Sequence, residues 1–341
     1  MFTKSLSAIV VGAAISLATP AGAQQDIAWG TSAVGSAGHK ALVALATVLN
    51  REMKEYRVAV QPTPGAIVTM KGYATNQFDG YFASDIAYYE MHTDTARFKG
   101  FKPQIKRQLA QSFWAFTLEC GIGINPKEIG KIKSWRDLAG KNVFTGPLPF
   151  DTRAQIERAL GVLKVNKEYV EVDLSNVASV LNTGRISAFA IYTSAEVTPP
   201  PWLVEASIAA DWAALNPSPE ELAELKKAGF ATVEVDAKVF KRDVHASKVT
   251  LLPFYYGFHV GTERSEEDVY RMLKIVEANL DELVSADRSF EQIKANMAEM
   301  QRRGVASSVE FVPIHPGLAK YMREKGVWDS KWDNRIAQKS S

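Results

Sequence analysis

The chain has 341 residues, with 40 lysines and arginines against 38 aspartates and glutamates, a formal net charge of +2. This near-neutral balance argues against a nucleic-acid binder or an anionic-membrane binder, either of which needs a basic face. At 46% hydrophobic and 23% charged residues, the composition is that of a folded globular protein, and the length predicts two domains.

The first 23 residues have the pattern of a secretory signal peptide. Lys4 supplies a positive start, residues 6–17 are apolar, and Ala21-Gly22-Ala23 gives a small-residue cleavage pattern. An uncleaved membrane anchor is the alternative, but the apolar stretch is too short to span a bilayer comfortably. We therefore expect a mature, soluble chain that starts at Gln24 and resides in the periplasm.

Cys120 is the only cysteine. An exported chain with one cysteine has no internal disulfide, so the hydrophobic core has to hold the fold together. Because apolar residues and glycines flank it, we interpret Cys120 as a buried structural thiol instead of a reactive one.

The first part of the chain alternates strands with helices. Strands are predicted over residues 26–31, 57–60 and 79–83, and apolar residues at helical spacing follow each of them. A turn rich in small residues, 30–38, joins the first strand to its helix, and Ser84 and Asp85 stand where the cap of the third helix is expected. This alternation predicts a mainly parallel α/β sheet.

The pattern then repeats and returns. Further strands are predicted over 109–118 (with a continuation over 121–124 after a break), 142–145, 169–172, 188–192 and 248–260. Helices are predicted over 134–141, from 153, and over 177–181, 266–284, 290–303 and 316–325. The apolar segment 248–260 is interpreted as a return crossing into the first domain.

Two α/β lobes joined by two extended crossings define the predicted fold class, a two-lobed periplasmic binding protein of type II-like form with C-terminal helices. The first lobe is predicted to comprise residues 24–112 and 254–341, and the second lobe residues 113–253.

Several motifs along the chain resemble those of one family. They are Gly30-Thr31 before the first turn, Phe82-Ala83-Ser84-Asp85-Ile86-Ala87-Tyr88, Lys133-Ser134-Trp135-Arg136-Asp137-Leu138-Ala139-Gly140-Lys141, Thr145-Gly146-Pro147, and His315-Pro316-Gly317-Leu318-Ala319-Lys320-Tyr321 with Glu324-Lys325-Gly326. In order and spacing the chain resembles the TAXI family, the extracytoplasmic solute receptors of one class of TRAP transporters. The resemblance implies a hinged binding protein that delivers its solute to a TRAP-type membrane permease.

The chain departs from that family at expected ligand contacts. Ser32-Ala33-Val34 replaces a tighter glycine pair, Phe150-Asp151-Thr152 stands where the family tends to show Ser-Gly-Thr, and residues 198–229 are unlike the family core. Family members bind glutamate-like or dicarboxylate solutes. Because the departures fall at the ligand, that identity is not carried over to this chain.

The predicted site contains two turns of the same kind, each between a strand and a helix N-terminus. A strand, a small-residue turn and a helix N-terminus expose backbone N–H groups and a partial positive charge, which together bind carboxylates or phosphates. The chain makes this arrangement at residues 30–36 and 146–152. If each lobe contributes one turn, the two turns face each other across the cleft, where open α/β sheets place their ligands.

Ten residues are the predicted ligand contacts: Thr31, Ser32, Ser36, Ser84, Asp85, Gly146, Thr152, Arg153, Tyr192 and Thr193. Arg153 has the fork geometry to grip a carboxylate, although a solvated arginine in the first helical turn is the alternative. Capping and binding are both open for Ser84 and Asp85. Asp151 is interpreted as a helix N-cap in preference to a ligand contact.

An enzyme is not expected. The turn at Gly30 resembles a phosphate loop, but Ser36 stands where the essential lysine belongs. No Gly-x-Ser-x-Gly elbow occurs, and the five histidines form no zinc motif. We therefore expect no catalytic residue, no metal and no cofactor.

The remaining expectations concern partners and mechanism. A small organic acid or amino acid and a TRAP-type permease are the expected partners, with a membrane sensor as the alternative to the permease. A monomer is expected. The proposed mechanism is hinge closure, in which the ligand bridges two helix N-termini and shifts an existing open–closed equilibrium.

Overall fold

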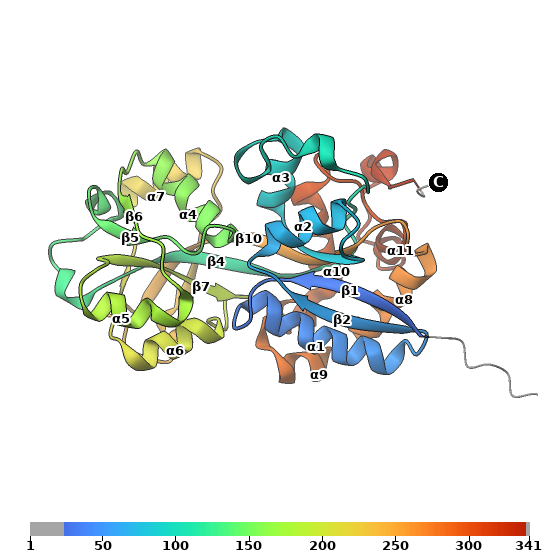
Figure 1. Ribbon diagram of the computed structural model, residues 1–341, viewed down its shortest axis with the longest axis horizontal. Helices are drawn as coiled ribbons and strands as arrows, with labels where there is room; N and C mark the ends of the chain where they lie inside the picture. The colour runs from blue at the N-terminus through green and yellow to red at the C-terminus, as the bar shows by residue number, and fades with distance from the viewer. Residues whose placement is uncertain (1–23, 339–341) are drawn as a thin grey trace, which may run out of the picture.

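The computed structural model describes residues 24–338, and the predicted signal peptide lies outside these residues. Figure 1 shows two lobes side by side, with the N-terminal and C-terminal parts of the chain in one lobe and the middle of the chain in the other. The predicted two-lobed α/β fold is confirmed. The lobe boundaries given above stay a prediction.

A single sheet runs through both lobes, in the order β2-β1-β3-β10-β4-β7-β5-β6, with β8 paired to β4 and β9 paired to β10. The strands are β1 (Gln25–Thr31), β2 (Tyr56–Pro62), β3 (Gly80–Ser84), β4 (Trp114–Ile124), β5 (Asn142–Phe144), β6 (Glu168–Tyr169), β7 (Ala188–Ser194), β8 (Ala213–Leu215), β9 (Val233–Asp236) and β10 (Lys248–Val260).

The sheet is mixed, so the prediction of a mainly parallel sheet is wrong. Strands β1, β2 and β3 are parallel in one lobe, as are β5, β6 and β7 in the other. Between these sets, β10 and β4 run antiparallel to β3, to β7 and to each other. The difference arises because the two crossings are themselves strands of the sheet, and each enters it in the opposite direction to its neighbour.

Strands β4 and β10 form the connection between the lobes. Tyr256–Val260 of β10 pairs with β3, whereas Lys248–Leu251 pairs with β9. Leu118–Ile124 of β4 pairs with β7. The prediction of a return crossing over 248–260 agrees with β10 in both bounds.

The outgoing crossing differs from its prediction. Strand β4 runs unbroken from Trp114 to Ile124, and within 109–113 only Gln111 makes an isolated bridge, to Ile314. The expected break coincides with Glu119, a charged residue in an apolar run. The strand continues there because the Glu119 side chain finds partners inside the protein.

Helices cover the sheet in both lobes (Figure 1). The first lobe carries α1 (Ala37–Glu52), α2 (Ala66–Ala74), α3 (Asp85–Thr93), α8 (Glu266–Ala278), α9 (Leu280–Ala286), α10 (Glu291–Ser308) and α11 (Pro316–Glu324). The second lobe carries α4 (Asp151–Val162), α5 (Val177–Asn182), α6 (Pro201–Ala209) and α7 (Pro219–Lys227). Short 3-10 turns lie at η1 (Ala96–Phe98), η2 (Lys102–Gln104), η3 (Pro126–Glu128), η4 (Trp135–Leu138), η5 (Leu174–Asn176), η6 (Ala237–Phe240), η7 (Arg288–Phe290) and η8 (Ser330–Arg335).

One predicted helix, 266–284, is divided into α8 and α9 at Asn279. The Asn279 side chain donates to the Ile275 carbonyl and accepts a hydrogen bond from Arg51. Such side-chain bonds compete with the helical pattern and end α8 at this point. None of the helices in residues 24–338 is long and apolar enough to cross a membrane.

The core extends along the sheet through both lobes. Its largest buried side chains include Trp29 in the first lobe, Trp114 at the start of the crossing strand β4, and Trp135 and Trp212 in the second lobe. Cys120 lies in β4, fully buried, and its thiol donates to the Leu252 carbonyl of β10. Burial raises the pKa of the Cys120 thiol above its ordinary value, so Cys120 is an unreactive core thiol, as predicted.

Glu119 is a fully buried carboxyl in the crossing strand β4. It accepts hydrogen bonds from the Thr117 hydroxyl, from the Thr193 hydroxyl at 2.7 Å and from the Glu196 backbone N–H at 2.9 Å. Burial raises its pKa to about 8, although these donors oppose the shift. The carboxyl is therefore largely protonated at neutral pH and ties β4 to the end of β7.

We predict that Glu119 makes stability fall as pH rises. Its folded pKa of about 8 exceeds the ordinary 4.5, so its contribution is complete below pH 4.5 and is lost by pH 8, at about 1.4 kcal/mol per pH unit at most. In urea unfolding at several pH values, Glu119→Gln should remove this slope and leave the neutral-pH fold intact. Glu234→Gln, at an exposed position of β9, is the matched control. An unchanged slope in Glu119→Gln would contradict the assignment.

Candidate functional site

A narrow cavity lies where the two lobes meet, and we call it the inner cavity. It is lined from the first lobe, the second lobe and the crossing strands by Ser32, Ser36, Ala37, Gly38, Ala66, Phe82, Leu118, Phe150, Asp151, Thr152, Tyr192 and Tyr256. Both turns that the sequence predicts as anion sites therefore contribute to one cavity.

Three helix N-termini converge on the inner cavity, since Ala37, Ala66 and Asp151 begin α1, α2 and α4. No acidic residue stands in the first turn of α1 or α2, and no side chain caps the N-terminus of α2 or α4. Each N-terminus directs N–H groups and a partial positive charge outward. The cavity thus suits a negatively charged or hydrogen-bond-accepting group.

The hydroxyl groups around the cavity differ in whether they have a hydrogen-bond partner. Ser36 is the N-cap of α1 and accepts a hydrogen bond from the His39 backbone N–H at 3.2 Å. Thr152 is only 3% exposed, lines the cavity, and its hydroxyl has no partner among the described residues. A buried hydroxyl without a partner costs free energy, so Thr152 is ready to bond to a molecule in the cavity.

The rest of the lining is apolar or aromatic. The rings of Phe82 and Tyr256 stack with centroids 4.2 Å apart and an interplanar angle of 10°. Leu118 and Phe150 complete this surface. Apolar walls with a few placed polar groups are the usual construction of a small-molecule site.

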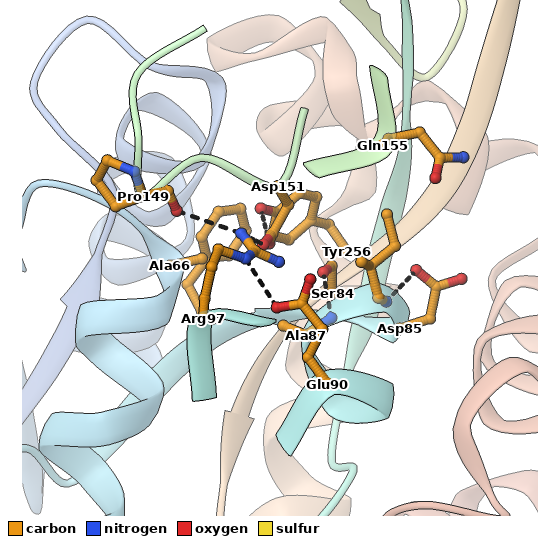
Figure 2. A network of polar contacts seen from close by, with 12 residues as sticks. Ala66, Ser84, Asp85, Ala87, Glu90, Arg97, Pro149, Asp151, Gln155 and Tyr256 are labelled. Carbon is orange, nitrogen blue, oxygen red and sulfur yellow. Dashed lines mark hydrogen bonds and ion pairs between the residues drawn. The ribbon is translucent and has the colours of Figure 1, made fainter. Parts of the chain in front are cut away.

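An ion pair joins the lobes beside the cavity (Figure 2). Arg97 in η1 donates through Nη1 to Asp151 at 2.5 Å and through Nε to Glu90 at 2.8 Å. The Tyr256 hydroxyl donates to the other oxygen of Asp151. Asp151 is only 1% exposed. The interpretation of Asp151 as an N-cap is wrong, because Phe150 holds the cap position and the Asp151 carboxylate is bound to Arg97 and Tyr256 instead.

The lobes are closed on one another. The inner cavity has a volume of about 20 Å³, which is room for about one water molecule. The Tyr192 hydroxyl from the second lobe meets the Ala37 backbone N–H at the start of α1. Gly65 approaches the second lobe so closely that an added Cβ would lie 2.9 Å from the Pro149 Cβ and carbonyl oxygen. A solute can therefore enter only after the lobes separate.

Four of the ten predicted ligand contacts, Ser32, Ser36, Thr152 and Tyr192, come together in the lining of the inner cavity. Tyr192 also accepts a hydrogen bond from the Trp202 indole at 3.1 Å. Thr31 is fully buried behind this lining, and its hydroxyl lacks a partner among the described residues.

Two further predicted contacts lie on the first-lobe side. Ser84 caps α3, because its hydroxyl accepts from the Ala87 backbone N–H at 3.1 Å. Asp85, the first residue of α3, accepts a hydrogen bond from the Ile86 N–H (Figure 2). Burial raises the pKa of Asp85 to about 7, nearby Asp151 adds to the rise, and backbone N–H donors oppose it.

The last three predicted contacts have partners within the second lobe. The Thr193 hydroxyl donates to Glu119, and the Gly146 carbonyl accepts from the Tyr169 hydroxyl at 3.0 Å. Arg153 lies with its guanidinium carbon 3.8 Å from the centroid of the Tyr169 ring, and its Nε is 3.6 Å from Glu157. Arg153 lines a separate groove instead of the inner cavity.

Sequence reasoning missed the residues that close the site, Arg97, Glu90 and Tyr256. Arg97 follows α3 in a polar stretch with no motif, so no local signal identifies it. Tyr256 belongs to a strand that was predicted, but its role depends on which residue of the other lobe it meets. No cluster of three or more histidine, cysteine, aspartate or glutamate side chains in residues 24–338 is arranged to hold a metal ion.

The two lobes and the cavity between them define the class of fold, the two-lobed α/β fold of periplasmic binding proteins. A model of the NMT1-like family matches residues 29–326, so the chain belongs to the NMT1-like family. No curated protein matches the chain.

The chain is similar to several solved structures at low sequence identity. A structure described as a periplasmic transporter is 11% identical, with a TM-score of 0.50, over 83% of this chain and 95% of its own. A putative L-cystine ABC transporter from Listeria monocytogenes is 12% identical, with a TM-score of 0.45, over 84% and 98%. The alkanesulfonate-binding protein SsuA from Xanthomonas axonopodis pv. citri, bound to MOPS, is 12% identical, with a TM-score of 0.43, over 88% and 90%.

We predict that Gly65→Ala prevents full closure, since the added methyl group would meet Pro149 at 2.9 Å, well inside ordinary contact distance. Small-angle X-ray scattering of the ligand-free variant should show a larger radius of gyration than the unsubstituted protein. Gly161→Ala, in α4 with open space at the Cβ position, is the matched control and should leave the profile unchanged. Identical profiles for Gly65→Ala and the unsubstituted protein would contradict the prediction.

Proposed function

We propose that this chain binds a small organic anion, a carboxylate or an amino acid, between its lobes and delivers it to a TRAP-type membrane permease. The observation that carries the proposal is the convergence of the N-termini of α1, α2 and α4 on one cavity beside the unpartnered hydroxyl of Thr152. The ten residues predicted from the sequence remain the proposed contacts. Ser32, Ser36, Thr152 and Tyr192 have the most direct support, because they line the cavity.

The electrostatics of the cavity support an anion. Its formally charged lining residue is Asp151, whose carboxylate is bound to Arg97 and Tyr256. The N-termini of α1 and α2, whose first turns hold no acidic residue, can therefore offer their partial positive charge to a ligand, and a carboxylate matches both that charge and the N–H donors. The stacked rings of Phe82 and Tyr256 suit the apolar part of a small organic acid.

Hinge motion is the proposed route between empty and loaded states. The connections between the lobes are β4 and β10, which pair with each other from Trp114 to Cys120 and shift register between Tyr256 and Gly257. An irregularity in a strand pair permits bending there. A ligand that binds both lobes would then shift the population toward a loaded closed form.

The permease and the compartment rest on the sequence. The TRAP-type partner is supported by the motif order that resembles the TAXI family, and the periplasm by the predicted signal peptide. A monomer is the proposed state. The same binding chemistry would serve a membrane sensor, so the permease is the part of the proposal that binding assays alone do not test.

A thermal-shift screen tests the binding proposal. The chain from Gln24 onward should first be unfolded and refolded to remove carried-over ligand, then mixed with amino acids, dicarboxylates, keto acids, aromatic acids and sugars. We expect one acid class to raise the melting temperature, since a hundredfold excess over Kd adds about 2.7 kcal/mol of apparent stability. A shift with sugars alone would contradict the anion proposal.

Thr152→Val tests the site with the acid that this screen identifies. The substitution keeps the shape but removes the hydroxyl, and a hydrogen bond to a charged group is worth about 1.5–3 kcal/mol. We therefore expect a Kd raised about tenfold or more by calorimetry. Thr47→Val, at an exposed position of α1, is the control and should bind as the unsubstituted protein does. Equal affinities in both variants would remove Thr152 from the site.

A further inference from the structure

A second space lies between the lobes, and we call it the outer groove. It is lined by Glu90, Ala96, Arg97, Leu148, Arg153, Ala154, Glu157 and Arg158, and its volume is about 350 Å³. The groove is open to solvent and far larger than the inner cavity. Like that cavity, it is bounded by the first lobe on one side and by α4 of the second lobe on the other.

The Arg97–Asp151 ion pair lies between the two spaces. Arg97 belongs to the lining of the outer groove, and Asp151 belongs to the lining of the inner cavity. Their side chains meet at 2.5 Å, and Figure 2 shows the Arg97 guanidinium between Asp151 and Glu90. The ion pair therefore forms part of the boundary between the groove and the cavity.

The pair is built to hold the lobes together. Arg97 is 17% and Asp151 0% exposed in their side chains, so water screens their attraction only weakly. The pair also has support from both sides, since Glu90 accepts from Arg97 and Tyr256 donates to Asp151. These contacts join η1, α3 and β10 to the start of α4.

The backbone that presents Arg97 is strained. Asp94 and Ala96 both adopt left-handed conformations, with φ of 55° and 47°, and such residues persist only where surrounding contacts hold them. Lys71 supplies one of those contacts by donating to the Arg97 carbonyl at 2.7 Å. Strained non-glycine residues beside a charged cross-lobe contact are typical of segments that clamp or switch.

One N–H donor group of Arg97 makes no hydrogen bond to the described residues. The Arg97 Nη2 atom is buried and has no partner among the described residues. A guanidinium carries several N–H donors, and a free one can bond to a new acceptor before the existing carboxylate leaves. Arg97 can therefore exchange Asp151 for another acceptor without a step in which both nitrogens lack a partner. The arrangement therefore permits opening as well as closure.

We propose that Arg97 and Asp151 form a gate that keeps the ligand-free lobes closed and whose opening connects the outer groove with the inner cavity. The groove lining holds three arginines, Arg97, Arg153 and Arg158, against two glutamates, Glu90 and Glu157, so its formal charge is positive by one and the route favours anions. This inference rests on the proposed function only for what passes the gate. The gate itself is a property of the ligand-free protein.

Thiol labelling tests the gate without any ligand. Thr152→Cys puts a thiol in the lining of the inner cavity, and the native Cys120 is buried and stays silent. We expect slow labelling by a small uncharged thiol reagent in Thr152→Cys alone, and an uncharged reagent keeps changes in local charge out of the comparison. Adding Arg97→Gln or Asp151→Asn should raise the labelling rate tenfold or more. Asp151→Asn leaves Arg97 paired with Glu90, so it keeps the test decisive if Arg97→Gln fails to fold.

Arg158→Gln in the same Thr152→Cys background is the matched control, because Arg158 lines the groove but bonds within its own helix, to Gln155. It should leave the labelling rate unchanged. Equal rates with and without Asp151→Asn would overturn the gate, as would an equal acceleration by Arg158→Gln. Neither result bears on whether the cavity binds an acid, which the thermal-shift screen decides separately.

Discussion

Hydrogen bonds between β4 and β10 hold both lobes on one sheet, and every element of the site takes its position from that pairing. One end of β10 pairs with β3 in the first lobe and the other end with β9 in the second. The lobes therefore cannot slide past one another, and their relative freedom is reduced to bending and twisting of two strands. Glu119 and Cys120 fasten these strands to their surroundings from within.

Strand ends and helix starts gather at the bend. The turn after β1 and the turn after β5 each lead into a helix whose N-terminus points at the inner cavity. Because these positive ends come from different lobes, they approach only when the lobes approach. The ion pair between Arg97 and Asp151 lies at the same junction, so the helix N-termini proposed to bind a ligand and the ion pair proposed to hold the lobes closed share one small volume.

Much of this arrangement is local, and local features can be predicted from sequence. Residue patterns predict the bounds of β10 and a capping role for Ser84. They also predict the small-residue turn that places Ser32 and Ser36 in the cavity lining. Arg97 could not be found in this way, because its partner Asp151 is 54 residues away and across the cleft. Asp151 itself was misassigned, since an aspartate at a helix start usually caps it and only tertiary contact shows another role.

The order in which the chain emerges has a consequence for how it folds. Strand β10 lies between β3 and β4 in the sheet. In the sequence, however, it comes after both of them, and the strands and helices of the second lobe lie in between. The sheet of the first lobe thus cannot be completed until the second lobe has been synthesised, and β3 presents an unpaired edge until then. Pairings so distant in sequence are slow to form and vulnerable to aggregation.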